Sequence, residues 1–180
     1  MKIYGRHMSP NEHWKTTRSA QAYKSSIVPG VTNFGIVFGP NAFPANNSVI
    51  YANEVQVEYI VKTIFQPILS GHFTAIDVKE ASEVRDANTI QEKLKTMVWS
   101  AGCSNWNLDA NGRNTTNYPD NTWKFWYQLY WPEWEDFNFV GDTGRRSMSP
   151  LQSLSLMTMD TAGMVLGVLL HVFLVVKSTE

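Results

Sequence analysis

Few side chains in this sequence combine the types and the spacing that catalysis or metal binding requires. The histidines are His7, His13, His72 and His171. They lie far apart along the chain, so each is interpreted as a surface or packed residue rather than a metal ligand. The single cysteine, Cys103, excludes an internal disulfide and has no base near it in the sequence. We therefore expect an inert thiol in a loop and no metal site.

Two pairs of charged residues have a spacing that suits acid–base chemistry or an ion pair. Glu54 and Glu58 are one helical turn apart, but such carboxylates more often form a solvated helix face. Asp109 and Arg113 share a turn region, where an ion pair contributes little free energy. Neither pair identifies a catalytic residue, so the catalytic residues stay unknown at this level.

The turn Gly39-Pro40-Asn41 is the candidate ligand-binding position. It closes the apolar run 33–39, which predicts a buried strand that ends in a turn. A turn of this kind presents backbone amides at a sheet edge, where ligands bind in open α/β folds. The Asn41 side chain offers both a donor and an acceptor. Taken alone, the pattern favours an ordinary turn.

The sequence lacks the motifs that hold dinucleotides and phosphates. G-x-G-x-x-G, G-x-x-x-x-G-K-[ST], G-x-S-x-G and H-E-x-x-H are all absent. The net charge is −1 and the Lys and Arg residues are scattered, so a basic face for nucleic acid is not indicated. The N-terminus has no apolar signal-peptide core, and one cysteine fits a reducing compartment, so we expect an intracellular location.

Hydrophobic periodicity predicts the elements that position these residues. Ser48 is expected to cap a helix over 49–66, which Pro67 and Gly71 end. The apolar face of this helix consists of Val57, Ile60, Val61, Ile64 and Phe65. Residues 73–78 alternate like a half-buried strand.

A second helix is expected to begin at Ser82 and to end near Trp99. Its apolar face consists of Val84, Ala87, Ile90, Leu94 and Met97. Residues 100–122 are rich in turn-forming types and predict a long loop, and 123–131 have a strand-like composition. The order strand, helix, strand, helix indicates an α/β or α+β fold.

The C-terminal third differs in composition from the rest of the chain. Five of the seven tryptophans lie between Trp99 and Trp131, which predicts an aromatic-rich layer that must pack on something. Residues 135–160 have the composition of a polar linker. The 16 residues Thr161–Val176 carry no formal charge and predict a hydrophobic helix. Its length leaves a membrane anchor and a buried or interfacial helix equally open.

An ordered series of short motifs resembles one known family. The series runs Asn11-Glu12-His13-Trp14, Val28-Pro29-Gly30, Gly39-Pro40-Asn41, Glu54-Val55-Gln56, Ile76-Asp77-Val78-Lys79, Gly102-Cys103-Ser104-Asn105-Trp106, Gly112-Arg113-Asn114 and Tyr118-Pro119. Over roughly residues 5–126 it is similar to the C-terminal half of the FAD domain in flavin-containing and Baeyer–Villiger-type monooxygenases, the fungal members included. Asn107 stands where a Tyr is common, which puts the substrate class in doubt.

The resemblance implies an oxidoreductase that inserts one oxygen atom with FAD, NADPH and O₂. It implies that residues 1–134 are part of an FAD-binding domain, with Gly39, Pro40 and Asn41 beside the flavin ring. Because the dinucleotide motifs are not in this chain, we expect it to be inactive alone and to need a chain that supplies the FAD- and NADPH-binding region. The alternative is a non-enzymatic interaction or membrane-attached module, with Trp106, Trp123, Trp126 and Trp131 as its docking face.

Overall fold

The computed structural model describes residues 3–45, 48–100 and 105–141. The chain divides into two compact units, Met1–Ser147 and Met148–Glu180, and the described residues all lie in the first. The predicted helix 161–176, most of the predicted linker 135–160 and Cys103 are outside the described residues. Within the described ranges, no helix is both long and apolar enough to cross a membrane.

Helices alternate with a small sheet in the described part of the chain, which confirms a mixed helix and strand fold. The elements are α1 (Pro10–Thr16), α2 (Val49–Ile60), the π-helix η1 (Val61–Phe65), α3 (Gln66–Leu69), β1 (Ala75–Val78), α4 (Glu80–Leu94), the 3₁₀ turn η2 (Val98–Ser100), α5 (Thr122–Tyr130), the 3₁₀ turn η3 (Trp134–Asp136) and β2 (Phe137–Val140).

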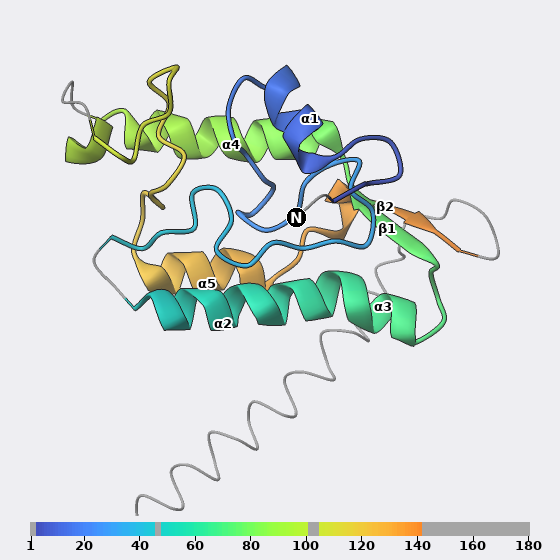
Figure 1. Ribbon diagram of the computed structural model, residues 1–180. Helices are drawn as coiled ribbons and strands as arrows, with labels where there is room; N and C mark the ends of the chain where they lie inside the picture. Colours follow the sequence, from blue (N-terminus) through green and yellow to red (C-terminus); the bar gives the residue numbers. More distant parts are fainter. Residues whose placement is uncertain (1–2, 46–47, 101–104, 142–180) are drawn as a thin grey trace, which may run out of the picture. The chain divides into compact units, whose positions relative to one another are not determined.

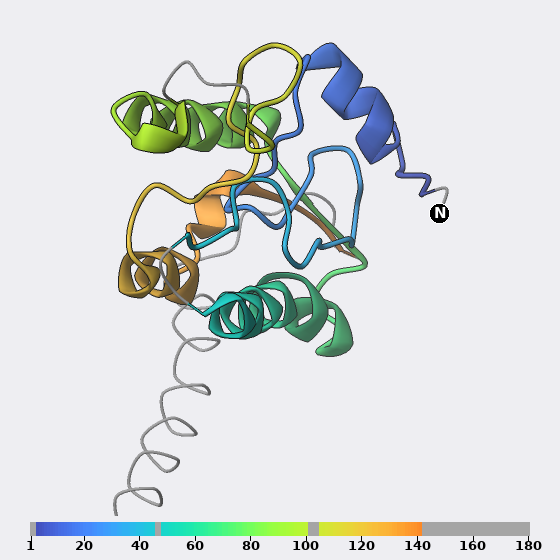
Figure 2. The same cartoon turned by 60° about the vertical axis from the view of Figure 1, so that its left-hand side comes forward.

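The helices lie in two layers on either side of the sheet and the N-terminal loops. Helix α4 lies on one side, and α2 and α5 lie next to each other on the opposite side (Figure 1). Figure 2 shows the same separation from a second direction, with β1 and β2 between the layers. The core fills the space between these layers and contains Tyr23, Tyr59, Ile64, Leu94 and Phe125, all fully buried.

The two strands pair in an antiparallel ladder in which Ala75 faces Val140 and Val78 faces Phe137. Ile76, Val78, Phe137 and Phe139 turn their side chains into the core, as the two-residue period of a strand requires. The predicted strand at 73–78 is therefore confirmed. Strand β2 lies within the range 135–160 that was predicted as linker, and it pairs with β1.

The helix predicted over 49–66 forms, and Ser48 caps it by accepting a hydrogen bond from the Tyr51 amide. Pro67 does not end it, which corrects the predicted boundary. The helix widens into the π-turn η1 and then takes Pro67 into the first turn of α3, where a missing amide hydrogen costs little. The helix ends at Leu69, and Gly71 follows with φ +75°.

The second predicted helix is α4, which begins two residues before Ser82 and ends at Leu94. Its predicted apolar face is confirmed at Ala87, Ile90 and Leu94 and wrong at Val84, which is exposed. The buried position beside it is instead Glu83, which has a hydrogen-bonding partner on α1.

The range 123–131, predicted as a strand, is instead helical up to Tyr130 in α5, and Trp131 caps that helix. Aromatic content misled the prediction, since aromatic residues favour strands only where the pleated packing surface is available. Phe125 and Leu129, both 1% exposed, are spaced at i and i+4, which places their side chains on the same buried face of a helix.

The strand predicted at 33–39 is also wrong. Asn33 and Phe38 have φ values of +59° and +58°, which break an extended chain at both ends. The backbone amides of this segment bond to separate partners, Ile36 to the Ser26 carbonyl and Phe38 to the Gln56 side chain, so no ladder forms. The first strand of the expected order is therefore an ordered loop.

Candidate functional site

The turn Gly39-Pro40-Asn41 is fixed against the loop 105–121. Asn41 is buried with φ +60°, and its backbone amide donates to the Thr115 carbonyl at 2.9 Å. Its side-chain Nδ2 donates to the carbonyls of Asn114 and Asn117 at 2.9 and 3.0 Å. The donors of Asn41 therefore hold the fold together, while Gly39 and Pro40 remain partly exposed.

The loop that receives Asn41 is itself preorganised. The Asn114 side chain accepts from the amides of Thr116 and Asn117, and its own amide donates to Asn117 Oδ1. Gln91 of α4 donates to the Asn114 carbonyl at 2.8 Å. Because these hydrogen bonds join neighbouring residues of the loop to one another and to α4, the loop has a defined shape to which the turn docks.

Gly39 has no space for a side chain. A Cβ on Gly39 would lie 2.3 Å from the Ser25 carbonyl oxygen. The same carbonyl accepts from Gln56 Nε2 at 2.9 Å, while Gln56 Oε1 accepts from the Phe38 amide at 2.9 Å. Gln56, fully buried on α2, thus fixes both sides of this close approach.

Left-handed backbone conformations cluster around this point. Lys24, Ser25, Phe38 and Asn41 all have φ between +48° and +60°. A bulky residue such as Phe38 reaches this region only where the surroundings over-determine it, and such strain concentrates at functional sites.

Exposed aromatic rings border the turn. The Phe38 and Phe43 ring centroids are 6.2 Å apart, and Phe43 and Trp106 are 5.7 Å apart, both edge to face. Trp106 is 72% exposed and Phe38 is 46% exposed. An accessible aromatic surface beside a rigid turn is suited to contact a flat, partly apolar ligand.

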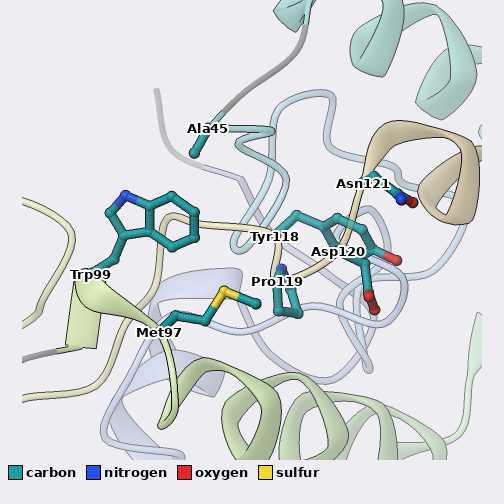
Figure 3. A pocket seen from close by; sticks show the side chains of 7 residues that line it. All are labelled: Ala45, Met97, Trp99, Tyr118, Pro119, Asp120 and Asn121. Carbon is teal, nitrogen blue, oxygen red and sulfur yellow. The ribbon is translucent and has the colours of Figure 1, made fainter.

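A cavity of about 320 Å³ lies at the C-terminal end of the loop 105–121 (Figure 3). Met97 and Trp99 line one side, and the run Tyr118–Asn121 lines the other. Burial acts to raise the pKa of Asp120, but hydrogen bonds from Lys93 and Lys124 hold that pKa below its ordinary value. The cavity is at the small end of ligand pockets and cannot enclose a dinucleotide.

The other residues singled out in the sequence do not converge on this turn. His13 is buried and its Nε2 bonds to both carboxylate oxygens of Glu83, at 2.8 and 2.9 Å. His72 Nδ1 bonds to the Ser70 hydroxyl. Asp109 accepts from the backbone amide of Arg113 and not from its guanidinium, so the predicted ion pair is replaced by a turn hydrogen bond. In the described ranges, no histidine, cysteine and carboxylate cluster suits a metal ion.

One buried charge network was not predicted from the sequence. Asp136 accepts hydrogen bonds from the Tyr23 hydroxyl at 2.6 Å, the Ser82 hydroxyl at 2.8 Å and the Arg85 guanidinium. Burial acts to raise the pKa of Asp136, but these hydrogen bonds hold it below the ordinary value. Since Tyr23 and the two α4 donors are distant in sequence from Asp136 and from each other, no local sequence signal identifies the network.

Comparison with curated proteins finds relatives in one functional class, although no protein-family model matches the chain. A Baeyer–Villiger monooxygenase of Streptomyces coelicolor is 36% identical over 115 residues, which are 63% of this chain and 22% of that protein. A Baeyer–Villiger monooxygenase of Pseudomonas aeruginosa is 32% identical over 61% of this chain. An FAD-binding monooxygenase of Aspergillus niger is 26% identical over 78% of it.

Solved structures agree on the fold. Cyclohexanone monooxygenase from Rhodococcus, bound to NADP⁺, superimposes with a TM-score of 0.64 at 21% identity, over 78% of this chain and 27% of that one. An oxidised steroid monooxygenase bound to NADP gives a TM-score of 0.65 at 16% identity. The chain spans about a fifth of the length of the first two curated relatives, 22% and 21%. In sequence and in fold, therefore, the chain resembles a segment of the Baeyer–Villiger monooxygenases, as its ordered motifs predicted.

Proposed function

We propose that this chain is the C-terminal part of the FAD-binding domain of a flavin-dependent monooxygenase. It acts in oxygen insertion only together with a polypeptide that supplies the FAD- and NADPH-binding motifs. The observation that carries the proposal is the 36% identity over 115 residues to a Baeyer–Villiger monooxygenase, a span that supplies no glycine-rich dinucleotide motif. When bound in such an assembly, FAD and NADPH supply the oxygen activation and the hydride.

The residues at the turn fit one edge of a flat cofactor ring. They do not supply contacts for the rest of a dinucleotide cofactor. Gly39 and Pro40 are partly exposed, and Phe38 and Trp106 expose aromatic surface beside them. Asn41 contributes by holding the turn in place, since its donors are used within the fold. The sequence contains no glycine-rich loop of the G-x-G-x-x-G type, which in dinucleotide-binding folds leads into the helix N-terminus that binds a pyrophosphate.

Flavin retention tests this proposal. The purified chain is mixed with excess FAD, passed over a desalting column and measured by flavin absorbance and fluorescence. We expect no retained flavin, because the adenine and pyrophosphate contacts are missing. Stoichiometric flavin on the chain alone would contradict the proposed division of the site. The Gly39→Ala variant, whose Cβ would collide with the Ser25 carbonyl oxygen and so displace the turn, serves as the control for any signal that does arise from the turn.

A second candidate is a non-enzymatic interaction module. Three aromatic side chains of the α5 region favour it, since Trp123, Tyr127 and Trp131 are between 43% and 60% exposed. Trp126 is partly buried against Tyr130, with ring centroids 4.9 Å apart, so it is not the open anchor that the sequence suggested. Sedimentation of the purified chain tests this alternative, because a monodisperse monomer without detergent argues against an open aromatic docking face. The intracellular location, and any membrane attachment through 161–176, stay proposals.

A further inference from the structure

The helix formed by α2, η1 and α3 has apolar side chains on two sides. One side packs into the core through Ala52, Val55, Tyr59 and Ile64. The other side leaves a row of large apolar side chains exposed. These are Ile50 at 72%, Val57 at 46%, Val61 at 38%, Phe65 at 47% and Leu69 at 83%. We call this row the outer face of α2.

The spacing of the outer face indicates an interface. Val57, Val61, Phe65 and Leu69 follow at four-residue steps, which keeps them on one side of the helix. A helix that is apolar all round is normally covered on both sides, and contiguous exposed apolar rows mark contact sites for other molecules.

Two carboxylates give the outer face a charge preference. A groove of about 450 Å³ is lined by Ile50, Asn53, Glu54, Val57 and Glu58. Glu54 and Glu58 lie one turn apart, and neither forms a salt bridge within the described residues. Like charges at this spacing destabilise a helix, and an arginine or lysine from outside would relieve the repulsion.

The same face of a second copy does not supply that cation. The only basic residue between positions 50 and 69 is Lys62, which is 6% exposed and lies over the Tyr130 ring at 4.4 Å. An anionic lipid surface is repelled by the same two carboxylates. A separate polypeptide segment with apolar side chains and a basic residue fits both features of the face.

We propose that the outer face of α2 docks the polypeptide that supplies the dinucleotide-binding motifs. A segment of that polypeptide covers Val57, Val61 and Phe65, and its arginine or lysine lies between Glu54 and Glu58. The inference rests on the proposed function.

Site-specific photo-crosslinking in the source cells tests the docking. A benzoylphenylalanine is placed at Val57 on the outer face or, as the matched control, at the exposed Asn88 on α4. We expect Val57, and not Asn88, to capture a polypeptide with a G-x-G-x-x-G motif that carries FAD. Capture of a second copy of the chain, capture of lipid, or no product at Val57 would overturn the proposal.

Charge reversal separates this inference from the proposed function. The double variant E54K/E58K should reduce the crosslink at Val57 about tenfold or more, whereas E92K on α4 should leave it unchanged. If the flavin-binding polypeptide is captured at Asn88 instead, the docking face is wrong and the proposed function stands. If Val57 captures a protein without dinucleotide motifs, the proposed function is wrong as well.

Discussion

Single residues in this chain act through partners that are distant in sequence. The carboxylate of Glu83 is fully buried and bonds to His13 of α1 and to Gln21 Nε2, so three segments meet at one charge. The hydrogen bond to Glu83 raises the pKa of His13, with burial opposing it and the charge of Glu80 adding to it. The pair therefore couples stability to pH.

This coupling has a definite sign. Because the folded pKa of His13 lies above its unfolded value near 6.5, the pair stabilises fully below that value and loses its contribution as pH rises through the folded pKa. We expect the free energy of unfolding, measured with urea between about pH 6 and about pH 9, to fall as the pH rises from about 6.5 through the folded pKa of His13.

The Glu83→Gln variant is the control for the pH effect. It removes the charge and keeps a polar group near His13, so the decline between neutral and alkaline pH should flatten. At neutral pH the variant should be less stable by about 1–3 kcal/mol, since it loses a hydrogen bond to a charged group while His13 becomes neutral. An equal slope in the wild type and the variant would show that another group sets the pH dependence.

At the scale of elements, caps and spacing predicted more than composition did. Ser48 and the apolar period predicted α2, and the period through Ala87, Ile90 and Leu94 predicted α4. The segment 123–131 was assigned as a strand on aromatic content alone. The helix there depends on burial against α2, which local sequence does not report.

The α5 helix gives a test of which aromatic side chains carry its stability. Phe125 is 1% exposed and its ring centroid is 4.8 Å from that of Tyr118, so Phe125→Ala should lower the free energy of unfolding by about 3–5 kcal/mol. Trp123→Ala, at a position 60% exposed, should cost less than about 1 kcal/mol. Urea unfolding measures both, and similar losses for the two variants would contradict the assigned helix orientation.

At the scale of the whole molecule, the candidate site shows where sequence reasoning stops. Gly39-Pro40-Asn41 is visible as a motif, but its role depends on Asn114 and Asn117, which lie 73 and 76 positions away. Gln56, which fixes the neighbouring backbone, lies on α2 within a stretch selected only for its apolar period. A Gly-Pro-Asn turn is common in sequences. The loop that binds this turn can be recognised only from the three-dimensional contacts between them.

Asn41 offers a prediction about how strongly this long-range docking contributes. Asn41→Ala removes the donor to two buried carbonyls and leaves a Cβ at φ +60°, so we expect a loss of about 2–3 kcal/mol in urea unfolding. Asn41→Gly removes the same donor but adopts the left-handed backbone freely, so it should be more stable than the alanine variant by about 1 kcal/mol.

The comparison between these two variants separates the loss of the side-chain hydrogen bonds from the backbone strain. The Asn114 carbonyl keeps its bond from Gln91 in both, so the donor loss should act mainly at Asn117 and should be shared by both variants. A shared loss relative to the wild type measures the side-chain bonds that join the turn to the loop, and the difference between the variants measures the backbone strain. If both variants match the wild type within about 0.5 kcal/mol, the turn is not held by Asn41 and the rigid edge proposed for cofactor contact has no structural basis.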